Sequence, residues 1–120
     1  MARNEFITYQ GKTILFEDFS NLSPGPEMFE TIATAQQIVT RQPPKSVLVL
    51  LDATGVHFDA DTLAAFKQSV LANKPFVKCA VVFGVSGLLN IALNAVSNIA
   101  GENFKSFPDK TSALEYLFNQ

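Results

Sequence analysis

The stretch that decides the fold is Val47-Leu-Val-Leu-Leu-Asp-Ala-Thr-Gly-Val-His-Phe-Asp-Ala-Asp-Thr-Leu-Ala-Ala-Phe66. It opens with the apolar run 47–51, which is typical of a strand buried on both faces of a parallel sheet. A polar turn follows, and Asp59 is expected to be the N-cap of a helix over 59–74. That helix carries one apolar stripe, made of Leu63, Phe66 and Val70. The stretch therefore predicts a buried strand, a turn and a capped helix.

Alternating apolar runs and amphipathic segments continue this pattern on both sides. Two short β-rich runs, 5–10 and 13–17, are expected to form a hairpin around Gly11-Lys12. Further strands are predicted over 46–51, 76–84 and 103–107, and helices over 27–41, 59–74, 86–100 and 108–118. The order β-β-α-β-α-β-α-β-α predicts a single α/β domain over residues 1–120. We expect a mostly parallel five-stranded sheet with an antiparallel N-terminal hairpin and four helices.

Composition excludes several classes of function. The net charge is −2 and the nine basic residues are spread along the chain, which argues against a nucleic-acid partner. The aromatic residues are 11 Phe and 2 Tyr with no Trp, which indicates core packing. The single Cys79 lies in an apolar run and is expected to be a buried, reduced thiol. The N-terminal residues show no apolar signal region, so a cytoplasmic location is expected.

The turn after the central strand holds polar side chains that could bind a metal ion or take part in catalysis. His57, Asp59 and Asp61 alternate along the turn, which brings an imidazole and two carboxylates to one side if the backbone is extended. Such a set suits a metal ion or general acid–base chemistry. Capping and the helix dipole are the stronger explanation and account for both acids alone, and the chain has no other His. We therefore predict no catalytic residue, no metal ligand and no cofactor.

A second unusual stretch runs from residue 79 to residue 101 and contains no charged residue. Asn, Gly and Ser interrupt it, so we do not predict a membrane span. On its predicted helix the polar positions are Asn90, Asn94, Ser97 and Asn98. Interface cores are depleted in charge, so this helix is a candidate docking surface for a protein partner or for a second copy in a homodimer. The alternative is an ordinary surface helix that happens to be uncharged.

The residues of the turn also resemble a known family. Asp52, Thr54, Val56 and Phe58 match the spacing of the conserved loop of STAS domains, the bacterial anti-sigma-factor antagonists. Gly84-Val-Ser-Gly87 and the segment 107–117 resemble motifs of the SpoIIAA-like group within that superfamily. The resemblance implies a SpoIIAA-like fold and a bacterial regulatory module that acts through protein–protein contact.

One departure from the family bears on regulation. Switch-type members accept a phosphate on a Ser at the start of the second helix, and Asp61 stands at that position here. Ala60 precedes it where the family usually has Asp, and Thr62 is the only neighbouring hydroxyl. We therefore expect no phosphorylation switch.

Three functions follow, in order of preference. The first is a non-enzymatic interaction module whose surface runs from Thr54 to Phe66, with the predicted contact residues Asp52, Thr54, His57, Asp59, Asp61 and Thr62. The second is binding of a small apolar ligand or lipid, which a resemblance to CRAL-TRIO-like proteins and the Phe-rich, uncharged C-terminal half imply. Its pocket would be lined by Phe76, Phe83, Phe104 and Phe107. An enzyme ranks last, because the chain shows no complete catalytic motif.

Overall fold

The computed structural model describes residues 3–85 and 104–120. The strands are β1 (Asn4–Tyr9), β2 (Lys12–Asp18), β3 (Val47–Asp52), β4 (Val77–Phe83) and β5 (Phe104–Phe107). The helices in the described residues are α1 (Pro26–Val39), α2 (Ala60–Asn73) and α4 (Lys110–Phe118). The helix predicted over 86–100, with Asn90, Asn94, Ser97 and Asn98, lies outside the described residues. The predicted count of four helices is therefore not supported, and the docking helix stays a prediction.

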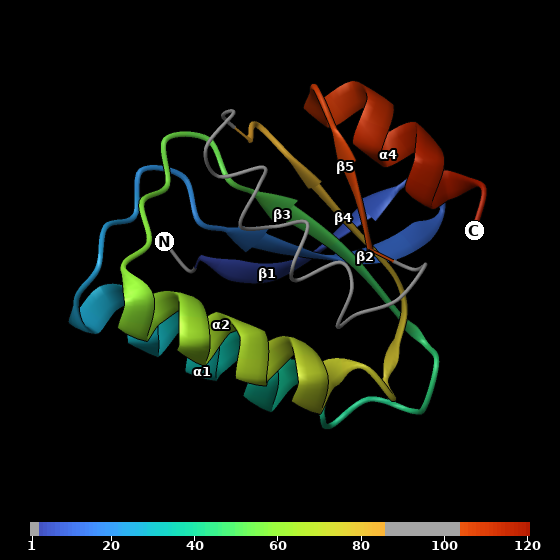
Figure 1. The fold of residues 1–120 in the computed structure, drawn as a ribbon. Coiled ribbons are helices and arrows are strands. Elements are labelled where there is room, and N and C mark those ends of the chain that lie inside the picture. Colours follow the sequence, from blue (N-terminus) through green and yellow to red (C-terminus); the bar gives the residue numbers. More distant parts are fainter. Residues whose placement is uncertain (1–2, 86–103) are drawn as a thin grey trace.

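The five strands form one sheet in the order β1-β2-β3-β4-β5 (Figure 1). β1 and β2 are antiparallel, whereas the pairs β2–β3, β3–β4 and β4–β5 are parallel. The predicted mixed sheet with an N-terminal hairpin is confirmed. α1 connects β2 to β3 and α2 connects β3 to β4, because a parallel connection needs a long crossover, which a helix provides.

The sheet is covered on both faces. α1 and α2 lie side by side along one face, and α4 packs on the opposite face (Figure 1). β3 is the central strand, and its first five residues are all buried. Val47 and Val49 belong to the core toward α1, and Leu48 and Leu50 belong to the core beneath α4. The strand is apolar throughout because successive side chains enter two different cores.

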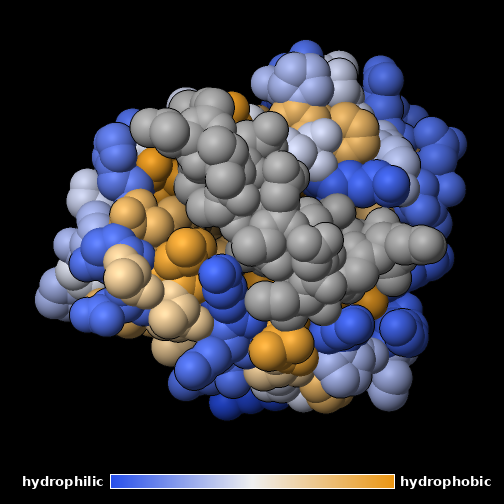
Figure 2. Space-filling model, viewed as in Figure 1, coloured by the Kyte–Doolittle hydropathy of each residue, from blue (hydrophilic) through white to orange (hydrophobic). Residues whose placement is uncertain are grey.

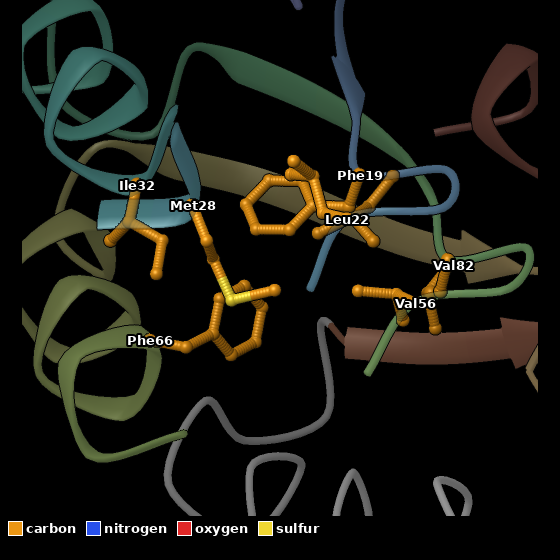
Figure 3. Packing of buried hydrophobic residues seen from close by; sticks show 9 residues of the cluster. Phe19, Leu22, Met28, Ile32, Val56, Phe66 and Val82 are labelled. Atoms are coloured by element: carbon orange, nitrogen blue, oxygen red, sulfur yellow. The ribbon is translucent and has the colours of Figure 1, made fainter. Parts of the chain in front are cut away.

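The core between the sheet and α1 and α2 is built from side chains that lie far apart in the sequence. Figure 3 shows the side chains of Met28 and Phe66 directed toward each other, with Phe19 and Leu22 beside them. The rings of Phe19 and Phe66 pack edge to face with centroids 5.7 Å apart. The two helices and the segment after β2 are thus held together by one apolar cluster.

The N-terminal hairpin closes one residue earlier than the sequence suggests. Tyr9 pairs with Lys12, so the loop is Gln10-Gly11 and not Gly11-Lys12. Both loop residues have positive φ, 48° at Gln10 and 86° at Gly11. Two positive φ values are the signature of a type I′ turn, whose twist matches that of the flanking strands. The predicted loop position was therefore wrong by one residue.

Candidate functional site

The predicted contact residues lie where β3 ends and α2 begins. The β3–α2 loop, residues 53–59, leaves the sheet at the carboxyl end of β3. The carboxyl ends of β2 and β4 lie on either side, since Asp52 is in register with Asp18 on β2 and with Phe83 on β4. In open α/β sheets, binding sites commonly form at this edge, beyond the carboxyl ends of the strands.

The backbone of the β3–α2 loop is tied to the segment that follows β2. Asn21 N–H donates to Thr54 O at 2.8 Å, and His57 N–H donates to Leu22 O at 2.9 Å. Within the loop, the Asp52 carboxylate accepts from Thr54 N–H at 2.9 Å. The loop is therefore held in one shape by main-chain hydrogen bonds, and Val56 anchors it further in the apolar cluster around Met28.

Two glycines allow this loop to fold tightly. Gly55 has φ of 67°, and a Cβ at this position would collide with the Asn21 side chain. Gly84, directly after β4, has φ of 79°, and a Cβ here would lie 3.0 Å from Thr54 N and 3.1 Å from Thr54 Cα. Both positions need a left-handed conformation and the absence of a side chain.

The structure divides the predicted contact residues into two groups. Thr54, His57, Asp59 and Asp61 are exposed, and Asp52 is half-buried. Thr62, in contrast, is fully buried at 0 % exposure. Phe66, expected at the end of the contact surface, is also buried and belongs to the core. The accessible part of the predicted surface is therefore the loop and the first turn of α2.

Asp59 and Thr62 form a reciprocal capping box. Thr62 N–H donates to the Asp59 carboxylate at 2.8 Å, and Asp59 N–H donates to the Thr62 hydroxyl oxygen at 2.9 Å. The hydrogen bond from the Thr62 backbone is the largest cause that lowers the pKa of Asp59, followed by the bond from the Thr62 side chain. The predicted N-cap is confirmed, and Asp59 serves the helix as predicted.

The described residues do not bring metal-ligating side chains together. Among residues 3–85 and 104–120, no group of three or more His, Cys, Asp or Glu residues is placed to hold a metal ion, so His57, Asp59 and Asp61 do not form one. Cys79 is a buried free thiol, as predicted. Burial raises its pKa, against a smaller opposing effect of Lys105 and Lys78, so the thiol stays protonated and unreactive.

A cavity of about 80 Å³ lies between the sheet and the helices α1 and α2. Its described lining is mostly apolar and includes Phe19, Ile32, Ala35, Val49, Leu51, Phe66, Val70, Val77, Ala80 and Val81. The polar residues in that lining are Glu17, Ser69, Asn73, Lys45 and Lys74. A mainly apolar cavity with a few converging polar groups is the usual form of a small-molecule site.

Glu17 is the unexpected residue of this cavity. Its side chain is buried, with 6 % exposure, and burial raises its pKa to about 7. Within the part of the chain that the structure describes, its carboxyl group has no hydrogen bond and no ion pair. The sequence places Glu17 at the end of a predicted strand and suggests no role for it. Its burial could have been predicted from its position two residues after Leu15, which puts both side chains on the same face of β2.

The phenylalanines predicted to line a pocket are not in the described lining of this cavity. Phe83 and Phe107 pack in the core beneath α4, on the other face of the sheet from the cavity. Phe76 packs against the cluster around Val47, and the side chain of Phe104 lies outside the described residues. The cavity is lined instead by Phe19 and Phe66.

The visible surface of the molecule mixes apolar and charged residues over the α1 and α2 layer (Figure 2). The exposed large apolar side chains are Phe6, Phe29, Leu71 and Phe118. They belong to β1, α1, α2 and α4 and are thus distributed over the fold. No helix within the described residues is long and apolar enough to cross a membrane.

Comparison with solved structures identifies the fold. An uncharacterized protein of the DUF3478 family from Shewanella loihica PV-4, described as having a SpoIIAA-like fold, matches with a TM-score of 0.75. The match covers 95% of this chain and 91% of that chain at 18% sequence identity. No family model matches the sequence, and no curated protein matches it. The chain therefore has a SpoIIAA-like α/β fold, as its resemblance to that group predicts.

Proposed function

We propose that this chain is a non-enzymatic protein-interaction module of the STAS type that acts in bacterial regulation. The single observation that carries the proposal is the construction of the β3–α2 loop. Its backbone is hydrogen-bonded to the segment after β2, while the side chains of Thr54, His57 and Asp61 remain exposed. A surface that is already ordered loses little conformational entropy when a partner binds, which favours recognition by this loop.

A pull-down with matched variants tests this proposal. His57→Ala/Asp61→Ala removes two exposed side chains of the loop and the start of α2, and Thr111→Ala/Glu115→Ala removes two exposed side chains of α4. We expect a partner captured by the wild type to be captured by the α4 variant and lost by the loop variant. Circular dichroism checks that both variants fold. Equal capture by all three proteins contradicts the proposal.

The partner is a second protein or a second copy of this chain. Light scattering at micromolar concentration separates these two cases, because a homodimer doubles the mass. The surface predicted on the uncharged segment is tested at the same time by Asn94→Lys and Asn98→Glu. A dimer that persists in both variants excludes these positions as its interface.

We also propose that the module is not phospho-switched. Asp61 holds the position of the family's acceptor Ser, and the neighbouring Thr62 hydroxyl donates to the Asp59 carboxylate at 2.7 Å. Since Thr62 is fully buried, a kinase would have to unwind the start of α2 to reach it. Mass spectrometry of the protein isolated from its own cells tests this. A phosphate on Thr62 contradicts the proposal.

The cavity favours a second candidate function, the binding of a small apolar ligand. This candidate does not depend on the first, because the cavity lies under the helices and the β3–α2 loop lies at the edge of the sheet. Native mass spectrometry of the gently purified protein tests it. A retained mass above that of the bare chain supports it, and a full set of aliphatic probes that fail to bind in titrations contradicts it.

A further inference from the structure

The lining of the cavity beneath α1 and α2 includes two hydrogen-bond acceptors that have no donor within the described residues. The Glu17 carboxylate lines it and has no partner within the described residues. Asn73 also lines it, and its buried Oδ1 atom has no hydrogen bond. Buried acceptors without donors are costly, and each one calls for an explanation such as a missing proton, water or ligand.

A third acceptor lies next to Glu17. Asn4 on β1 is directly opposite Glu17 in the antiparallel register. Its Nδ2 donates to Thr31 O at 3.1 Å, which fixes the orientation of the amide and leaves the buried Oδ1 without a partner. Residues that are directly opposite in an antiparallel pair have their side chains on the same face, about 5 Å apart at Cβ. One donor group close to Glu17 is therefore also close to Asn4.

The unpartnered Glu17 carboxylate, beside Phe19 and Leu51 in the cavity lining, defines the chemistry of the ligand. We propose that the cavity binds a short aliphatic amine, with its ammonium group against the Glu17 carboxylate and its alkyl chain among Phe19, Leu51 and Phe66. An ammonium group brings three donors and a positive charge, a hydroxyl brings one donor, and a carboxylate brings none. This inference rests on the second candidate function and names its ligand class.

The size of the cavity limits the alkyl chain. The cavity volume of about 80 Å³ is several times the roughly 10–15 Å³ that one water needs. A short amine such as n-propylamine, with four non-hydrogen atoms, is a probe of matching scale. Several waters are the alternative occupants, and titration with an amine separates the two cases.

The lysines of the lining do not oppose an ammonium group at Glu17. Glu17 is in register with Leu51, whereas Lys45 precedes β3 and Lys74 follows α2, both near the level of Val47. Four residues of strand separate Val47 from Leu51, which corresponds to about 13 Å. This is a separation of backbone levels, and both lysines line the same cavity. Burial alone raises the pKa of Glu17, and neither lysine contributes to that shift. Lys45 and Lys74 are the other ionisable groups in the described lining.

Titration with three probes of similar size tests the inference. The full chain is titrated with n-propylamine, 1-propanol and propionate at constant ionic strength, and binding is followed by the amide resonances of cavity residues. We expect n-propylamine to bind more tightly than the other two. Glu17→Gln is expected to weaken its binding by about tenfold or more, because a charged hydrogen bond is lost. Glu5→Gln, the same change at an exposed position, is expected to leave binding unchanged.

The dependence of binding on pH gives an independent readout. A proton on Glu17 competes with the ammonium group, and the pKa of Glu17 is about 7. Propylamine binding is therefore expected to be about tenfold weaker at pH 6 than at pH 8. The pH dependence should disappear in Glu17→Gln.

The outcomes separate this inference from the candidate function on which it rests. If 1-propanol or propionate binds at least as tightly as propylamine, or if Glu17→Gln binds propylamine like the wild type, the amine inference is overturned while apolar-ligand binding stands. If none of the three probes produces a saturable shift, the amine inference is overturned, and the apolar-ligand candidate is then decided by the full set of aliphatic probes.

Discussion

At Glu17, a carboxyl group lies inside the apolar layer between β2 and the helices α1 and α2. Its neighbours along the face of the strand are Leu15 and Phe19, both almost fully buried. A charged group in such a place is destabilising unless it is paired, and the usual response is a shifted pKa. The raised pKa of Glu17 therefore links this one residue to the stability of the whole protein.

We predict that stability falls with increasing pH between about 4.5 and 7 because of Glu17. In this range the folded state holds the Glu17 proton and the unfolded state does not, so unfolding releases a proton and rising pH favours it. The loss is complete above pH 7 and amounts to about 3 kcal/mol. Urea unfolding at pH 5 and pH 8 measures it. The decrease of stability with pH should disappear in Glu17→Gln and remain in Glu5→Gln. A decrease that persists in Glu17→Gln shows that Glu17 is not its cause.

Gly84 and Gly11 provide a matched pair at the same scale. Both have positive φ, 79° and 86°, but a Cβ at Gly84 meets Thr54 while a Cβ at Gly11 meets nothing within 4 Å. We expect Gly11→Ala to cost about 1 kcal/mol from backbone strain alone. Gly84→Ala should cost about 1–3 kcal/mol more, because the Thr54 backbone must move. Urea unfolding of both variants measures the two losses of stability. Equal losses contradict a steric conflict between the Cβ at position 84 and Thr54.

At the scale of elements, α2 begins at a site that serves structure and surface together. The Asp59–Thr62 capping box satisfies backbone N–H groups at the helix start. Asp61, between these two residues, points its exposed side chain away from the core and takes part in no such box. One turn of helix therefore contains a residue that the fold requires and a residue that is available to a partner.

The capping box predicts different costs for neighbouring acids. Asp59→Ala should destabilise the protein by about 1 kcal/mol, and Asp61→Ala should change stability by less than about 0.5 kcal/mol. Hydrogen bonds from Thr62 lower the pKa of Asp59 in the folded protein. The stability that Asp59 contributes is therefore fully present above its ordinary pKa of 3.8 and is lost as pH falls through the lower folded pKa. Urea unfolding at pH 7 and pH 3 measures both effects. Equal costs for the two variants would show that the cap does not stabilise α2.

At the scale of the whole molecule, the sheet separates two apolar layers. Ile14 belongs to the layer beneath α4, and Ile32 belongs to the layer that α1 and α2 form. Both side chains are buried, at 0 % and 5 % exposure, but they share no cluster. The molecule is nevertheless small enough to unfold as one cooperative unit.

We predict that Ile14→Val and Ile32→Val act independently. Each should cost about 0.5–1.5 kcal/mol, because each removes one buried methylene. The double variant should show the sum of the two costs within about 0.5 kcal/mol, and unfolding should remain a single transition. Urea unfolding of the three variants measures the coupling. A coupling well above 1 kcal/mol contradicts the separation of the two layers.

The sequence by itself determined the architecture of the described elements. The five predicted strands, the antiparallel start and the buried central strand follow from local pattern, because a strand buried on both faces must be apolar throughout. Asp59 was identified as the N-cap for the same reason, since capping depends on a few adjacent residues. These properties are local, and a sequence reports them directly.

Only the tertiary structure decided which residues surround the cavity and which remain at the surface. Glu17 and Asn73 are far apart in the sequence, and they line one cavity only when β2 and α2 enclose one face of the sheet. In the same way, Thr62 is lost from the predicted contact surface because its hydroxyl is buried in the capping box. Burial depends on contacts between distant segments, and no local pattern contains that information.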